Sequence, residues 1–260
     1  MDSTDRITLL IKRDLTLWVH QWFSPAVIFL EFVTYLVIFA FVLNNLITSL
    51  SIEGETISYI SFLFPGILVM NFFITSISSG LLTYMDRRLG MLELLLTAPI
   101  SRQTIVVSRL LSTTIKSLIV GGFLTLIAIP LGVTIQSGVY RGVYVIVCCI
   151  LFSVAMAGLS IVLTARIQND QMFNAITNAF NLPLIFSSPL FYPRESMPVI
   201  LRRVSYFNPL TYGVTPIRSA LILETPVWFQ TDFLILIVIT IVFVFLAVIS
   251  YNKAMEELHV

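Results

Sequence analysis

The sequence has 260 residues, of which 57% are hydrophobic and 11% are charged, and its mean hydropathy is +0.96. A water-soluble fold cannot bury that much apolar surface, and a formal net charge of +1 gives no basic excess for binding nucleic acid. The composition therefore excludes a soluble globular domain and a nucleic-acid-binding protein. It predicts an all-α integral membrane protein, formed as a single transmembrane domain over residues 1–260.

The cysteines and histidines of the sequence form no catalytic or metal-binding pattern. Cys148 and Cys149 are adjacent in an apolar run, a spacing that suits neither a disulfide nor a metal site, and we interpret them as small packing residues. His20 and His259 lie near opposite ends of the chain and form no ligand set with cysteine or carboxylates. We therefore expect no catalytic residues, no metal site and no cofactor bound by this chain.

The N-terminal segment 4–23 has the pattern of an amphipathic helix that lies in the membrane interface. Its apolar residues recur at helical spacings of three and four: Ile7, Ile11, Leu15, Trp18 and Trp22. Lys12, Arg13 and Asp14 are predicted to point away from that apolar face. The simpler interpretation of this helix is a membrane anchor, and the alternative is a role in gating.

Six apolar stretches are long enough to cross the hydrocarbon core, which needs about 20 residues each. They are 26–48, 57–85, 104–133, 143–165, 172–192 and 233–251, and the third enters the hydrocarbon only near residue 117. Glu31 lies inside the first span, where it pairs across an interface or is shallow enough to meet water. With a cytosolic N-terminus, ten Lys and Arg residues fall on the inner side and five on the outer side. We therefore predict a multi-pass protein of the cytoplasmic membrane with both termini in the cytosol.

Prolines crowd the chain after the start of the fifth predicted span. Six of the eleven prolines lie between residues 183 and 216, so one continuous helix is excluded there. Two short helices are predicted at 197–206 and 210–223, within a re-entrant hairpin over 194–224 that enters from the outer face and returns. Such a broken backbone is stable at membrane depth only where protein shields it. A surface loop is the alternative.

Residues 87–99 are apolar but too short to span the membrane. Leu89 to Leu96 have the length for two helical turns, Pro99 ends that helix and Ser101 caps the next one. Exposing this row of leucines to water is unfavourable, so a partner protein is predicted to cover one face of a short helix across the cytosolic ends of two spans. A helix that rests on lipid is the alternative.

Two groups of residues form recognisable motifs at opposite ends of the predicted spans. The first motif comprises Arg88, Gly90, Glu93, Leu95, Ala98 and Pro99. The second includes Pro189, Pro193, Asn208, Pro209, Tyr212 and Arg218, in the re-entrant segment. Both resemble motifs of the type-2 ABC transporter permeases, which export drugs, lipids and polysaccharides: the first looks like the coupling helix that docks on a cytosolic ATPase, and the second is similar to the C-terminal signature. Met91 departs from the pattern, because many relatives carry a small hydroxyl residue there.

The resemblance implies a half-transporter, in which two copies of this chain, or this chain and a sister subunit, assemble over two ATP-hydrolysing subunits. ATP and Mg²⁺ are then bound by the partner ATPase. The sequence agrees, because a phosphate-binding loop needs a Gly-Lys pair before Ser or Thr, and none of the three lysines follows a glycine. The implied activity is ATP-driven export of an amphipathic drug, lipid or lipid-linked glycan by a non-catalytic membrane subunit. A secondary transporter or a membrane scaffold is the alternative.

Polar residues inside the predicted spans mark a candidate substrate path, because hydrogen-bonding groups in hydrocarbon are unfavourable unless they face protein or water. They form two rows at helical spacing: Asn71, Thr75 and Ser79 in one span, and Asn174, Asn178 and Asn181 in another. Hydrogen bonds between neighbouring helices are the alternative. Arg109 and Lys116 lie toward the cytosolic end of the third span, where they attract anionic groups or extend to the membrane surface.

Overall fold

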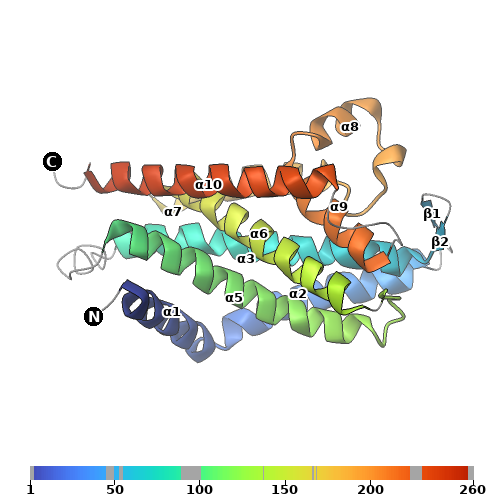
Figure 1. Cartoon of the computed structure of the whole chain (residues 1–260), viewed down its shortest axis with the longest axis horizontal. Coiled ribbons are helices and arrows are strands. Elements are labelled where there is room, and N and C mark those ends of the chain that lie inside the picture. The colour runs from blue at the N-terminus through green and yellow to red at the C-terminus, as the bar shows by residue number, and fades with distance from the viewer. Residues whose placement is uncertain are drawn as a thin grey trace.

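The computed structural model describes residues 3–44, 50–52, 55–88, 101–136, 138–165, 167, 169–222 and 230–256. The long helices lie side by side, with the start of α1 and the end of α10 at one end of the bundle and a two-stranded hairpin at the opposite end (Figure 1). The helices are α1 (Ser3–His20), α2 (Phe23–Asn44), α3 (Tyr59–Arg88), α5 (Arg102–Ala128), α6 (Val139–Thr164), α7 (Asp170–Phe186), α8 (Val199–Ser205), α9 (Pro209–Ile222) and α10 (Thr231–Glu256). The antiparallel strands are β1 (Leu50–Ile52) and β2 (Glu55–Ile57), and Arg194–Ser196 form one turn of 3-10 helix.

Four helices in the described part of the chain are long and apolar enough to cross a membrane: α3, α5, α6 and α10. Asp5–His20 and Pro25–Ile38, in α1 and α2, meet the same criterion only together, as a pair bent by 71°. α7 occupies the place of the predicted span 172–192, but it has 17 residues and ends at Phe186, where the chain turns. The structure therefore supports four or five membrane-crossing units, and the six-span topology stays a prediction.

α3 is the most enclosed of the four long apolar helices. Of its most apolar window, 89% is buried inside the protein, compared with 22% for α10. α2, α5, α6, α7 and α9 all pack against α3, which runs through the middle of the bundle (Figure 1). α10 instead exposes Leu234, Val238, Ile241 and Phe245, as expected of a helix face in contact with lipid.

α1 packs on the bundle through a face that overlaps only in part with the one that its apolar spacing predicts: Ile7, Ile11, Leu15 and Trp18 are half-buried. Leu10 and Asp14 are buried, with 8% and 4% of their surface exposed, whereas Trp22 just after the helix is 70% exposed. The prediction that Asp14 points away from the packed face is wrong, because Arg109 of α5 gives its carboxylate a buried partner. A buried charge is stable only when it is paired. An ion pair therefore helps to attach α1 to the bundle.

Small residues allow α3, α6 and α10 to approach closely. Gly80 of α3 faces Ser160 of α6, whose hydroxyl donates to the Ile77 carbonyl oxygen at 2.8 Å. A Cβ on Gly80 would overlap Ser160 Oγ and would lie 2.7 Å from the Ser160 carbonyl oxygen. At Gly158 of α6, a Cβ would lie 3.0 Å from the carbonyl oxygen of Phe243 in α10. Small residues are enriched at such contacts because helices in lipid associate mainly through close packing and interhelical hydrogen bonds.

We predict that Gly80→Ala destabilises the bundle by about 1–3 kcal/mol, because the added methyl group overpacks the contact between α3 and α6. Gly122→Ala is the matched control, since no atom lies within 4 Å of a Cβ there and alanine is favoured over glycine inside a helix by about 1 kcal/mol. Thermal unfolding of the purified protein in detergent measures both variants. Equal melting temperatures for the two would contradict the close helix contact.

Candidate functional site

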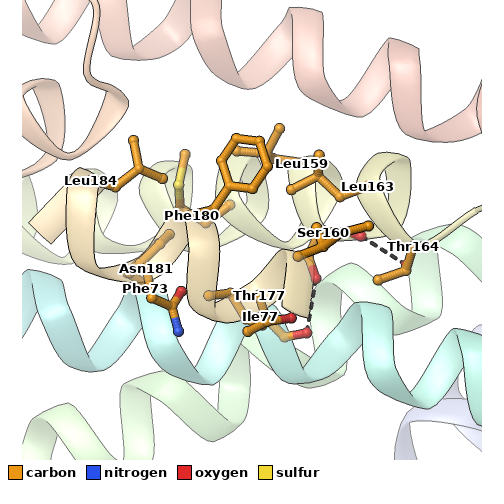
Figure 2. Close-up of a pocket in the computed structure, with 12 residues that line it drawn as sticks. Phe73, Ile77, Leu159, Ser160, Leu163, Thr164, Thr177, Phe180, Asn181 and Leu184 are labelled. Atoms are coloured by element: carbon orange, nitrogen blue, oxygen red, sulfur yellow. Dashed lines mark hydrogen bonds between the residues drawn. The ribbon is translucent and has the colours of Figure 1, made fainter. Parts of the chain in front are cut away.

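A pocket lies between α3, α6 and α7 (Figure 2). Its cavity volume is about 30 Å³, or about 400 Å³ when the open space at its mouth is included, and most of its lining is apolar, with Phe73 of α3, Met156 of α6 and Phe180 of α7 among the contributors. Two lining hydroxyls already have partners: Ser160 bonds across to α3, and Thr164 donates to the Ser160 carbonyl oxygen at 2.8 Å, as Figure 2 shows. A concave, mainly apolar lining with few polar groups is typical of a small-molecule site, although a cavity of about 30 Å³ must widen before it holds more than about one water molecule.

Asn181 lines this pocket from α7, and its Oδ1 is buried without a hydrogen-bond partner among the described residues. Leaving a buried acceptor unsatisfied costs about 1–3 kcal/mol, and native proteins keep few such groups. A donor carried by a bound molecule would satisfy this oxygen. The pocket therefore suits an apolar molecule that bears a hydroxyl or an amide N–H group.

The polar row predicted on α3 forms hydrogen bonds between helices. Asn71 Nδ2 donates to the Ser117 carbonyl oxygen of α5 at 3.2 Å. Thr75 donates to Asn71 Oδ1 at 3.4 Å, and Ser79 donates to the Ala157 carbonyl oxygen of α6 at 3.3 Å. All three residues of the row are buried. The row thus joins α3 to α5 and α6, and it does not face the pocket.

The polar row predicted on α7 does not meet the row on α3. Asn174 and Asn178 are exposed, whereas Asn181 is half-buried and lines the pocket. The predicted set omits four other α7 residues that line the pocket: Ile176, Thr177, Phe180 and Leu184. Together with Asn181 they recur at intervals of three and four residues, which places them on one helix face, and this spacing is the signal in the sequence that identifies them.

Residues 187–192 form a turn after α7, and Arg218 of α9 binds this turn to α3. Arg218 Nη2 donates to the Leu190 carbonyl oxygen at 3.1 Å, and Nε donates to the Phe62 carbonyl oxygen at 3.2 Å. The guanidinium carbon also lies 3.9 Å from the centroid of the Phe62 ring, in a cation–π contact. One buried side chain therefore connects α9, the 187–192 turn and the first part of α3.

Tyr59 and Gly66 of α3 make two further contacts with the same turn. The Tyr59 hydroxyl donates to the Phe191 carbonyl oxygen at 2.9 Å. A Cβ on Gly66 would overlap the Leu190 carbonyl oxygen and would lie 3.1 Å from its carbonyl carbon. The absence of a side chain at Gly66 is what lets the backbone of the turn rest directly on α3.

Asn208 joins the 187–192 turn to the start of α9. Its Nδ2 donates to the Leu184 carbonyl oxygen at 2.6 Å and to Ser187 Oγ at 2.8 Å. Pro209 is the first residue of α9. Proline is favourable there, because the backbone N–H that it lacks would form no hydrogen bond within the helix. The hydroxyl of Tyr212 donates at 2.6 Å to a backbone carbonyl just after α8.

The residues of the predicted re-entrant signature come together around the 187–192 turn. Pro189 is buried within the turn, and Pro193 is half-buried directly after it. The signature residues Asn208, Pro209, Tyr212 and Arg218 lie at or next to the contacts just described. The re-entrant hairpin predicted over 194–224 contains the short helix α8 and the longer helix α9, and α9 packs on α3, α6 and α10.

The predicted coupling helix over 87–99 falls almost wholly outside the described residues. α3 ends at Arg88, so the first motif begins where this helix stops. Gly90, Glu93, Leu95 and Pro99 lie outside the described part of the chain. α5 begins directly afterwards, and Ser101 caps it by accepting a hydrogen bond from the Thr104 N–H at 3.3 Å.

Comparison with known proteins gives a match to the ABC-2 type transporter family over residues 5–222. The chain belongs to this family. The putative transport permease ycf38 of Porphyra purpurea is 30% identical over 216 residues, which cover 82% of this chain and 72% of that protein. The ycf38 protein of Cyanophora paradoxa is 35% identical over 163 residues, covering 62% of this chain and little more than half, 56%, of that relative. The inner membrane transport permease YadH of Escherichia coli (strain K12) is 24% identical over 237 residues, covering 90% of this chain and 88% of that protein.

Membership of the ABC-2 type transporter family confirms the resemblance on which the sequence interpretation rests. The relatives are named as transport permeases, which agrees with a membrane transporter subunit. The long apolar helices, together with the relative named as an inner membrane permease, support a multi-pass membrane protein for this ABC-2 chain.

We predict that Arg218→Gln loosens the 187–192 turn. Hydrogen bonds from a charged donor are worth about 1.5–3 kcal/mol, so a buried Ser188→Cys reporter should react on the order of tenfold faster with a membrane-impermeant maleimide in this variant. Arg203→Gln on α8 is the control, because Arg203 is exposed. Equal labelling rates in the two variants would show that Arg218 does not hold the turn.

Proposed function

We propose that this ABC-2 transporter chain is the permease subunit of an ATP-driven exporter that moves an amphipathic molecule outward across the membrane. The observation that best supports this function is the apolar pocket between α3, α6 and α7, in which Asn181 Oδ1 has no hydrogen-bond partner within the described part of the chain. The lining of this pocket, once the helices around it separate, suits an apolar body with a single donor, which is the chemistry of an amphipathic drug or lipid. A lipid-linked glycan fits through its lipid part.

A separate ATPase subunit, which holds ATP and Mg²⁺, is proposed to supply the energy. The residues proposed to dock on it are those of the first motif, which begins at the last residue of α3: Arg88, Gly90, Glu93, Leu95 and Pro99. The position of this motif supports the assignment, because α3 is packed against five other helices and passes the motion of its end to them. The start of α1 and the end of α10 lie at the same end of the bundle as the end of α3 (Figure 1). We place this end in the cytosol, in agreement with the charge distribution.

A second permease subunit, identical or related, is proposed to cover α7. This helix makes few contacts with the rest of the chain, and it exposes Asn174 and Asn178 beside the apolar Met172, Leu182 and Phe186. Amide side chains are unfavourable against lipid unless protein or water satisfies them. A helix with both exposed amides and exposed apolar groups suits a subunit interface that lines a path for cargo.

The 187–192 turn is proposed to close the outer end of that path. Its contacts with Tyr59, Arg218 and Asn208 hold it against α3 and α9. The turn follows α7 directly, so cargo that leaves the α7 pocket toward the outside meets it next. Outward release then requires these contacts to loosen.

We predict that Asn181→Leu lowers the transport rate on the order of tenfold, because it removes the acceptor that pairs with the cargo, a loss of about 1–3 kcal/mol. Gln171→Leu is the matched control, since it removes an exposed amide at the start of α7, outside the pocket. ATP-dependent uptake of a fluorescent amphipathic dye into inverted vesicles, prepared from cells that also produce the ATPase, measures the rate.

Dye uptake without ATP hydrolysis, driven by an ion gradient, would favour the secondary transporter instead. Equal rates for Asn181→Leu and Gln171→Leu would contradict the pocket as the cargo site.

A further inference from the structure

A buried group of charged side chains joins three helices near the end of α3. Arg109 of α5 lies at its centre, with 6% of its side chain exposed. Its Nη1 donates to Asp14 Oδ2 of α1 at 2.8 Å, and its Nη2 donates to Asp86 Oδ2 of α3. One guanidinium thus bridges two carboxylates that belong to two different helices.

Burial of Arg109 is inconsistent with a side chain that extends to the membrane surface or collects headgroups. A buried cation is stable only where good geometry and further hydrogen bonds repay its lost hydration. The planar guanidinium presents several N–H donors in a fixed fork, so it can serve two carboxylates at once, whereas a lysine ammonium is a single point charge. Arginine is therefore the residue that this three-helix contact requires.

The two ends of the bridge differ in strength. Asp14 is 4% exposed and accepts hydrogen bonds from three residues. Besides Arg109, these are Ser112, whose Oγ lies 3.2 Å from Oδ2, and Arg13, whose Nη2 lies 3.1 Å from Oδ1. Asp86 is 19% exposed, and Arg109 is its one donor among the described residues. Water competes better for the more exposed carboxylate. The contact to α3 is thus the weaker one.

Apolar packing strengthens the same difference. Leu10 of α1 belongs to one buried cluster with Ile105, Val106 and Leu110 of α5, so α1 and α5 share an apolar contact beside their ion pair. Asp86 instead stands two residues before α3 ends, where the neighbouring Tyr84 and Met85 pack in a cluster with Phe173 of α7 that includes no residue of α5. The first motif begins at Arg88, so a displacement of that motif reaches this end of α3 first.

We propose that Arg109 is a positioning residue that holds α1 firmly on α5 and holds the end of α3 releasably. α1 and α5 then move as one body, and the Arg109–Asp86 contact is the one that breaks when the segment after α3 is displaced. The meaning of this movement for transport rests on the proposed function, but the unequal strength of the two contacts does not. α1 becomes part of the mechanism instead of a passive anchor.

Distances between helices in the full-length chain, reconstituted in lipid nanodiscs without any ATPase, test the proposal. Spin labels at Leu17 and Leu111 report on α1 relative to α5, and labels at Met85 and Leu111 report on α3 relative to α5. Leu17 and Leu111 are exposed and Met85 is half-buried, so all three accept a label. Cys148 and Cys149 are replaced by alanine, and double electron–electron resonance gives the distance distributions.

Asp86→Asn is expected to add a longer population to the α3–α5 distance and to leave the α1–α5 distance unchanged. Asp14→Asn is expected to do the reverse. Arg109→Lys should keep α1 in place, because the lysine ammonium can still pair with Asp14 beside Ser112. The same variant should release α3 from α5. It replaces a carboxylate variant in the test if that variant fails to fold. Lys12→Gln is the control, because Lys12 is exposed on α1, and it should change neither distance.

Movement of both distances together in each variant would overturn the proposal, because it would show one rigid three-helix unit. Unchanged distances in Asp86→Asn and Arg109→Lys would also overturn it. Failure of the exporter function would appear separately, as wild-type vesicles that show no ATP-dependent dye uptake.

Discussion

A polar group in hydrocarbon must find its hydrogen-bond partner within the protein, and this constraint acts most strongly on α3. α3 is enclosed by five other helices, so none of its polar side chains can turn to water along most of its length. Asn71 and Ser79 therefore bond to backbone carbonyls of α5 and α6, and Ser76 does the same at 3.2 Å from the Ser153 carbonyl oxygen. The hydrogen bonds that satisfy α3 also fix its neighbours around it.

Arginines from other helices hold α3 near both of its ends. Arg218 donates to the Phe62 carbonyl oxygen in its first turn, and Arg109 binds Asp86 in its last turn. Between them the helix carries one wall of the pocket that contains Asn181. In the proposed transporter, a displacement that begins at Asp86 therefore travels along one stiff helix, past the pocket, to the contacts that hold the 187–192 turn.

The sequence predicts helices well and contacts between helices poorly. The predicted span 57–85 corresponds to α3 at Tyr59–Arg88, because a long apolar stretch has few alternatives to a helix in lipid. The burial of Asp14 was missed because its partner Arg109 is 95 residues away, and helical spacing carries no information about such a pair. Whether Asn71 faces a path or another helix depends likewise on how α3 is rotated against α5. The signature that includes Arg218 is predicted from the resemblance to a family, because helical spacing alone does not indicate which distant residues belong together.

Hydrogen exchange of α3 tests the central claim most directly. The measurement uses the proposed complex of this chain with an ATPase, in lipid nanodiscs, and compares the state without nucleotide with the state in which ATP is bound under conditions that prevent hydrolysis. If α3 connects the two arginine contacts, backbone amides near Asp86 and those of the 187–192 turn should change their exchange together, while the middle of α3 stays protected. A change confined to the end near Asp86, with the turn unaffected, would contradict the account.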